Sequence, residues 1–185
     1  MRIIAGKFKS RRITFPRTKR VRPTMDRVRE SVFNVLNDDV RDACVLDLFS
    51  GCGSLGLEAL SRGARSADFV DKNHAAITAL KKNIQSLAVS DMTTVYKRDV
   101  LTFLRRTAAE NREFDLIFMD APYGSSITKK SLMKIYGFGI LARNGNMVVE
   151  HSIHDRLPSS KNIGIITHKD FGETRVSFLR RDNLR

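Results

Sequence analysis

The feature that most constrains this sequence is a regular alternation of short apolar runs and amphipathic segments that begins near residue 43. The apolar runs predict strands at residues 44–49, 67–70, 93–96, 114–119 and 146–150. Between two of them, Ile77, Leu80, Ile84 and Leu87 recur at helical spacing. Strands that alternate with helices are typical of a parallel, doubly wound α/β sheet.

The two ends of the chain depart from this alternation. Residues 163–167 and 175–179 flank a Phe-Gly-Glu turn and predict a closing antiparallel hairpin. Residues 2–5 and 12–15 flank a Gly-Lys-Phe-Lys-Ser segment and predict a short basic hairpin. We therefore expect a seven-stranded, mostly parallel sheet with a C-terminal antiparallel hairpin. We expect a basic extension at residues 1–23 and one main domain at residues 24–185.

The charge of the chain predicts a polyanionic partner. There are 33 Lys and Arg against 20 Asp and Glu, which gives a net charge of +13. The basic residues concentrate at positions 1–29, where Asp26 is the only acid. A soluble domain this basic usually meets a polyanion. The predicted phosphate-binding residues are Arg2, Lys7, Lys9, Arg11, Arg12, Arg22 and Arg27.

Other features exclude whole classes of protein. Cys44 and Cys52 are too few for a disulfide framework, which favours a reducing cytoplasm. The first residues do not resemble a signal peptide, and no apolar run is long enough to span a bilayer. His151 and His154 lack the Cys or carboxylate cluster that would complete a metal site, so no metal is expected. We expect a cytoplasmic monomer without a membrane association.

A glycine-rich loop follows the first predicted strand. Residues 51–56 match G-x-G-x-x-G, and they follow a strand and open a helix, as this nucleotide-binding motif requires. The glycines permit a tight turn and the close approach of a ligand to the backbone. The motif alone suits either a dinucleotide or another adenosine cofactor.

Acidic residues near the ends of successive strands separate these two possibilities. Asp47, inside the first strand, would repel a pyrophosphate but favour the ammonium and sulfonium of S-adenosylmethionine (SAM). Asp71 is expected to accept from ribose hydroxyls and Asp99 from the adenine amine, although they could instead be a turn residue and a helix cap. The predicted cofactor-binding residues are Asp47, Phe49, Ser50, Gly51, Gly53, Asp71, Lys72, Asp99 and Val100.

A short turn follows the fourth predicted strand and carries the predicted catalytic residues. These are Asp120, Ala121, Pro122 and Tyr123. In an open α/β sheet, ligands bind at the carboxyl ends of strands. The Asp120 carboxylate and the Ala121 carbonyl could accept both N–H groups of an exocyclic amine while Tyr123 stacks on the base. Asp120 could then take the proton after transfer.

With these residues, the chain resembles the class I SAM-dependent methyltransferases, which have a Rossmann-like fold. It is most similar to the bacterial family that methylates N2 of guanine 966 in 16S ribosomal RNA. The segments that carry this resemblance are residues 2–7, 22–24, 27–36, 45–64 and 171–174. The resemblance implies a ribosomal RNA substrate, within a small-subunit particle. It also implies that Asp47, Gly51, Gly53, Asp71 and Asp99 hold SAM and that Asp120 to Tyr123 hold the guanine.

The sequence departs from that family at three positions. Ala121 stands where the family usually has a first proline before Pro122, Asp71 where it often has Glu, and Cys52 where a small hydroxyl residue is common. The carbonyl of residue 121 survives the change from Pro to Ala, so we expect activity with a less rigid turn.

Three other functions compete with this interpretation. A DNA adenine-N6 methyltransferase would use the same turn, but 185 residues leave no room for a separate target-recognition domain. An NAD(P)-dependent oxidoreductase would use the glycine-rich loop, but Asp47 and the closing hairpin argue against it. A non-catalytic RNA-binding module is the third alternative, and the retained turn acid and glycines disfavour it.

Overall fold

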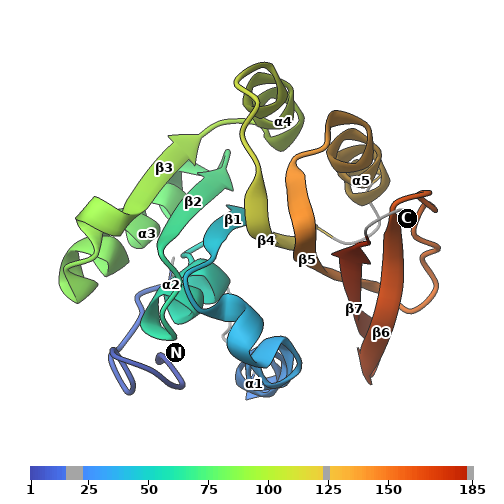
Figure 1. Cartoon of the computed structure of the whole chain (residues 1–185). Helices are drawn as coiled ribbons and strands as arrows, with labels where there is room; N and C mark the ends of the chain where they lie inside the picture. Colours follow the sequence, from blue (N-terminus) through green and yellow to red (C-terminus); the bar gives the residue numbers. More distant parts are fainter. Residues whose placement is uncertain (16–22, 123–125, 183–185) are drawn as a thin grey trace.

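The computed structural model describes residues 1–15, 23–122 and 126–182, and its helices cover both faces of a seven-stranded sheet (Figure 1). The strands are β1 Cys44–Leu48, β2 Ser66–Asp71, β3 Thr93–Lys97, β4 Phe114–Asp120, β5 Leu141–Ser152, β6 Ile163–Phe171 and β7 Thr174–Arg181. The α-helices are α1 Pro23–Leu36, α2 Ser54–Ser61, α3 His74–Leu87, α4 Val100–Ala109 and α5 Ile127–Phe138. Two short 3-10 turns, η1 Asn37–Val40 and η2 Ser90–Met92, precede β1 and β3.

The strand order across the sheet is β3-β2-β1-β4-β5-β7-β6. Strands β1 to β5 pair in parallel, and β7 pairs antiparallel with both β5 and β6. This arrangement confirms the predicted mostly parallel sheet with its antiparallel hairpin. The chain builds outward from β1 to β3 and then returns to place β4 on the other side of β1. The border between β1 and β4 is therefore the switch point at which α/β sheets bind ligands.

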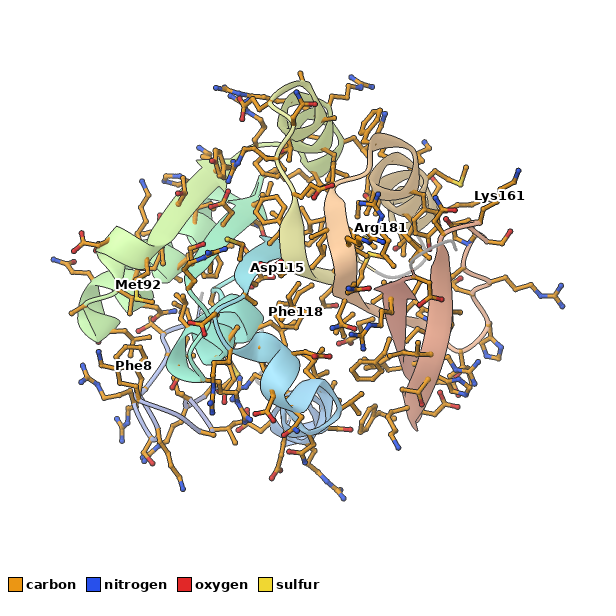
Figure 2. The ribbon with its side chains drawn as sticks, in the orientation of Figure 1. Phe8, Met92, Asp115, Phe118, Lys161 and Arg181 are labelled. Atoms are coloured by element: carbon orange, nitrogen blue, oxygen red, sulfur yellow. The ribbon has the colours of Figure 1, made fainter. Side chains whose placement is uncertain are left out.

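Two apolar cores lie on the two faces of the sheet. One unites side chains from α1, α2 and α3 and includes Phe118 of β4 (Figure 2). The centroid of its ring lies 5.7 Å from that of Phe33 on α1. The other lies beneath α4 and α5 and includes Phe103 and Leu132. Within the described ranges, no helix is both long enough and apolar enough to cross a membrane.

The strand β5 starts earlier than the sequence pattern predicts. It begins at Leu141, whereas the pattern predicted a start at Asn146. The predicted start was too late because a polar run over residues 143–146 interrupts the apolar pattern. Asn144 has a left-handed φ of 60°, and the register between β4 and β5 shifts at this level. An irregularity of this kind breaks the period-two alternation from which a strand is recognised.

The amino-terminal segment folds back on itself as predicted, but it forms one antiparallel bridge, between Arg2 and Arg12, rather than two regular strands. Some of its backbone N–H groups bond within the segment, such as Ile3 N to the carbonyl of Arg11, and others bond to α2. The N–H groups of Ile4 and Ala5 donate to the two carboxylate oxygens of Glu58, at 2.8 and 3.0 Å. The segment is therefore docked on the domain through a side chain of α2.

Glu58 is fully buried and is the centre of a charged cluster. Its carboxylate accepts from Nε of Arg62 at 2.9 Å and lies 3.7 Å from Nε of Arg29 on α1. Arg29 is also buried, and it donates to the carbonyl of Arg2. Burial lowers the pKa of Arg29, and the acids Glu58 and Asp26 oppose that shift. One buried acid thus joins the amino-terminal segment, α1 and α2.

We expect Glu58→Ala to destabilise the fold by about 3–5 kcal/mol, because it leaves buried Arg29 without its main counter-ion. Two backbone N–H groups of residues 4 and 5 also lose their acceptors. Urea unfolding of both proteins measures the difference. Glu110→Ala, which removes an exposed acid paired with Arg106, is the control and should leave the urea midpoint nearly unchanged. Equal midpoints for all three proteins would contradict a structural role for Glu58.

Candidate active site

The predicted acids gather along one edge of the sheet. Asp71, Asp99 and Asp120 lie at or just after the carboxyl ends of β2, β3 and β4, and Asp47 lies one residue before the end of β1. These four strands are neighbours in the order β3-β2-β1-β4. Because parallel strands end at the same edge, the fold brings together residues that are up to 73 positions apart in the sequence, from Asp47 to Asp120.

The three motif glycines have different tasks in the loop after β1. A Cβ at Gly53 would lie 2.4 Å from Cδ1 of Leu80, and one at Gly56 would lie 2.4 Å from the ring of Phe69. A side chain at either position would force its neighbours to shift, and Gly53 also has a left-handed φ of 83°, so both positions favour glycine. Gly51 has a left-handed φ of 56°, and a Cβ there would meet no atom of the described chain within 4 Å. The loop is therefore open at Gly51, where a ligand can approach the backbone.

Asp47 is a buried acid at the base of this loop. Its carboxylate accepts from the backbone N–H of Gly56 at 2.9 Å, and its side chain is 3% exposed. Burial raises the pKa of Asp47 to about 7; the Gly56 N–H opposes the shift, and the Asp71 charge adds to it. Among the described residues, no basic side chain forms an ion pair with Asp47. A cationic ligand would favour its charged form.

Asp71 and Asp99 are both bonded to nearby backbone. Asp71 accepts from Gly51 N at 2.9 Å and from Asn73 N at 2.7 Å, so it holds the glycine-rich loop against the next turn. Asp99 caps α4 by accepting from Thr102 N at 3.1 Å. The turn and cap roles considered from the sequence are therefore present. A carboxylate has about four lone-pair sites, so these bonds leave capacity for ligand hydroxyls or amines.

The remaining predicted cofactor residues differ in what they can offer. Ser50 is 7% exposed, and its hydroxyl has no hydrogen-bond partner among the described residues. Phe49 is partly buried with a φ of 58°, and Lys72 is exposed. Val100 is buried at the start of α4, and its apolar side chain can offer a ligand no hydrogen bond. An orphaned hydroxyl, an unpaired buried acid and an open glycine together fit a cationic adenosine ligand.

The predicted catalytic turn begins at the last residue of β4. Asp120 is exposed, Ala121 is buried and Pro122 is exposed. Tyr123 lies outside the described residues. Asp120 pairs in register with Glu150 of β5, so a second acid lies beside the turn. The sequence reasoning missed Glu150, although its place at the end of the predicted strand 146–150 was a usable signal.

The predicted phosphate-binding residues that the structure describes lie in two regions, the amino-terminal segment and α1. Lys7 and Lys9 lie in a turn whose backbone bonds to Ser61 at the carboxyl end of α2, which is the opposite edge of the sheet from Asp120. Arg11 donates to the carbonyl of Ser86 near the end of α3. Arg2 and Arg12 face each other across the bridge described above, and Arg27 is exposed on α1. Arg22 lies outside the described residues.

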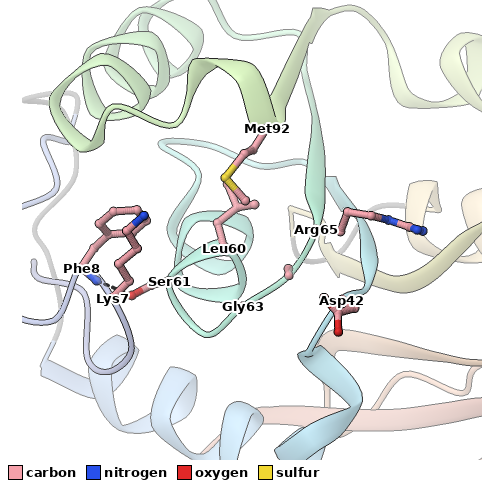
Figure 3. A pocket seen from close by; sticks show the side chains of 9 residues that line it. Lys7, Phe8, Asp42, Leu60, Ser61, Gly63, Arg65 and Met92 are labelled. Atoms are coloured by element: carbon pink, nitrogen blue, oxygen red, sulfur yellow. Dashed lines mark hydrogen bonds between the residues drawn. The ribbon is translucent and has the colours of Figure 1, made fainter.

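A cavity of about 400 Å³ lies at that opposite edge (Figure 3). It is lined by Lys7 and Phe8 of the amino-terminal turn, by Leu60 and Ser61 of α2, and by Met92, among others. These residues lie near the end of α2 and before the start of β3, so this cavity is separate from the acids at the carboxyl edge.

The two histidines considered from the sequence, His151 and His154, have protein partners. Nε2 of His151 lies 2.8 Å from the Ser177 hydroxyl, and burial lowers the pKa of this imidazole. His154 pairs with exposed Glu173 at 3.1 Å. Across residues 1–15, 23–122 and 126–182, no three His, Cys, Asp or Glu side chains are grouped as metal ligands would be.

Comparisons with known proteins identify relatives that align with almost the whole chain. The family model described as "Conserved hypothetical protein 95" matches residues 1–180. A Bacillus subtilis protein named "Putative rRNA methyltransferase YlbH" is 35% identical over 182 residues, which are 98% of this chain and 99% of the relative. The "Ribosomal RNA small subunit methyltransferase D" of Escherichia coli is 33% identical over 159 residues, 86% of this chain and 78% of that protein.

The fold also matches a solved structure closely. That structure is described as "Putative methyltransferase yhhF from Escherichia coli", and it superimposes with a TM-score of 0.88 at 30% sequence identity. The alignment covers 100% of this chain and 99% of that one. The predicted Rossmann-like methyltransferase fold is thereby confirmed.

The buried state of Asp47 predicts how stability depends on pH. Between its ordinary pKa of 3.8 and its folded value of about 7, the folded chain keeps a proton that the unfolded chain releases. This contribution to the free energy of unfolding is complete below about pH 4 and is lost as pH rises to about 7. We expect Asp47→Asn, which cannot ionise, to become increasingly more stable than the wild type over that window.

Urea unfolding of the ligand-free protein at a series of pH values measures this difference. Asp91→Asn, an exposed acid before β3, is the matched control and should follow the wild-type curve. If the Asp47→Asn and wild-type curves stay parallel from pH 4 to 7, the assignment of a raised pKa to Asp47 is wrong.

Proposed function

We propose a reaction for this chain, which belongs to the family described as "Conserved hypothetical protein 95". The chain transfers a methyl group from SAM to the exocyclic N2 of a guanine in small-subunit ribosomal RNA. The observation that carries this proposal is the pairing of β1 with β4, in which Leu48 lies opposite Met119. This pairing sets a buried acid with no ion-pair partner among the described residues, Asp47, beside the strand that ends in the base-binding turn.

Residues at or after the carboxyl ends of the first three strands hold SAM. Asp47 favours its positive charge, Gly51 and Gly53 shape the backbone around it, and the Ser50 hydroxyl is free to bond to it. Asp71 accepts from the ribose and Asp99 from the adenine. When bound, SAM supplies an electrophilic methyl group on a sulfonium.

Residues of the turn after β4 hold the guanine. Its exocyclic amine is a poor nucleophile, because the nitrogen lone pair is delocalised into the ring. The Asp120 carboxylate and the Ala121 carbonyl accept its two N–H groups and orient the lone pair. Tyr123 stacks on the base, a contact worth about 1–3 kcal/mol. Asp120 then takes the proton that the amine must lose.

The basic extension at residues 1–23 contacts phosphates of the RNA, and residues 24–185 form the catalytic domain. Two similarities support an RNA substrate: the names of the relatives specify ribosomal RNA, and one specifies the small subunit. The target base must leave its stack or lie in an unpaired loop. We infer that the chain acts as a cytoplasmic monomer on a small-subunit particle.

The proposal predicts N2-methylguanosine as the product. Labelled SAM should transfer its methyl group to small ribosomal subunits, or to their RNA, taken from cells that lack this chain. Nucleoside analysis of that RNA identifies the modified base. Label on adenine in DNA instead would indicate the rival adenine-N6 activity, and binding of NADH but not SAM would indicate an oxidoreductase.

In the same assay we expect Asp120→Ala to reduce turnover by a factor of 100 or more, on the order of what a lost general base costs. Its affinity for SAM should stay close to that of the wild type, because Asp120 contacts the acceptor. Asp91→Ala, an exposed acid at the opposite edge, is the control and should retain activity. Near-wild-type turnover in Asp120→Ala would sink the assignment of this residue.

Charge reversal at Lys7, Lys9 and Arg12 should weaken RNA binding and make it less sensitive to salt. Each lost phosphate contact lowers the slope of log affinity against log salt by about 0.7–0.9. Titrations of RNA at several salt concentrations measure the slope. Charge reversal at Lys161 and Lys169, exposed at the far edge of the sheet, is the control. A slope equal to that of the wild type would count against the amino-terminal segment.

A further inference from the structure

Asn83 is a buried polar residue on the apolar face of α3, between Leu80 and Ile84. It is 2% exposed, and its side chain has partners in two separate parts of the chain. The Oδ1 atom accepts from the backbone N–H of Thr14 at 2.8 Å. The Nδ2 group donates to the Thr14 carbonyl at 3.0 Å and to the Cys52 carbonyl at 3.0 Å.

The two partners of Asn83 belong to the two proposed binding regions. Thr14 lies in the amino-terminal segment between buried Ile13 and partly buried Phe15, and both of these neighbours pack on the core. In the sequence it is followed by Arg17, Lys19, Arg20 and Arg22. Cys52 lies in the glycine-rich loop, between Gly51, which faces open space, and Gly53, which precedes α2.

The geometry of the amide makes these two contacts interdependent. Both donated bonds come from one planar NH₂ group, whose two hydrogens have a fixed angle between them. A shift of Thr14 therefore rotates the group away from Cys52 or stretches that bond. The Cys52 carbonyl in turn belongs to the loop whose backbone, at Gly51, is also held by Asp71 at 2.9 Å.

We propose that Asn83 is a positioning residue that couples the RNA-binding segment to the cofactor loop, so that RNA and cofactor each raise the affinity of the other. This inference rests on the proposed function. RNA bound to the basic segment fixes the position of Thr14, which is hydrogen-bonded to the Asn83 amide. The amide in turn is hydrogen-bonded to Cys52 and keeps the glycine-rich loop in its binding conformation. Because binding free energies are linked, the cofactor must strengthen RNA binding by the same factor.

Calorimetric titration with S-adenosylhomocysteine, which allows no turnover, tests the coupling with and without saturating small ribosomal subunits from cells that lack this chain. We expect the wild type to bind this ligand more tightly with the subunits, by a factor in the range of about 5–150. In Asn83→Asp, which keeps the acceptor and the size but loses both donors, the factor should fall to about 1.

A second variant acts on the segment side alone. Thr14→Pro removes the backbone N–H that donates to Asn83, and it keeps the carbonyl of residue 14 and the contact between Asn83 and Cys52. Its affinity for S-adenosylhomocysteine without subunits should match that of the wild type, and its coupling factor should fall below the wild-type factor because one of the two bonds between residue 14 and Asn83 is lost. Gln85→Ala, exposed on the same helix, is the control and should keep the wild-type factor.

The outcomes separate this inference from the proposed function. If the wild type binds neither the ligand nor the subunits, the proposed function fails. If it binds both, but independently, the coupling is wrong. A wild-type factor that persists in Thr14→Pro, with thermal unfolding showing that the variant is folded, would also overturn the role of Asn83.

Discussion

The parallel pairing of β1 with β4 is the constraint on which the rest of the site depends. It places the end of β4, with Asp120, beside the glycine-rich loop that follows β1. The pairing exists because the chain reverses its direction of growth across the sheet after β3. At such a reversal the connections leave on opposite faces, which opens a crevice outside the strand ends. Two ligands can therefore bind side by side in this crevice, held by residues that are far apart in the sequence.

Two buried acids on the same side of the sheet are handled in opposite ways. Glu58 is surrounded by Arg29, Arg62 and two backbone N–H groups, so its charge is compensated within the protein. Asp47 has one N–H donor and a pKa raised to about 7. The first acid therefore fixes the position of the amino-terminal segment. The second has no basic partner among the described residues, so a positive charge placed beside it would favour its ionised form.

The sequence predicted the five parallel strands, the closing hairpin and the glycine-rich loop because each has a local signal, in periodicity or in turn residues. It failed where a local pattern was broken or where a partner was remote. The start of β5 was hidden by the polar run at residues 143–146. Asn83 sits at an apolar position of α3, and nothing local identifies its partners, Thr14 and Cys52, as bonded to it.

By itself the sequence determined the fold class and the set of candidate acids, because hydrophobic period and chain order are sufficient to place strand ends at one edge. Only the tertiary structure decided how those acids differ. Burial and hydrogen bonding depend on contacts across the sheet, such as that of Asp47 with Gly56. The tertiary structure also placed Lys7 at the edge opposite Asp120, and brought Asn83 between Thr14 and the loop. Such contacts join residues far apart in the chain, and local sequence patterns carry no record of them.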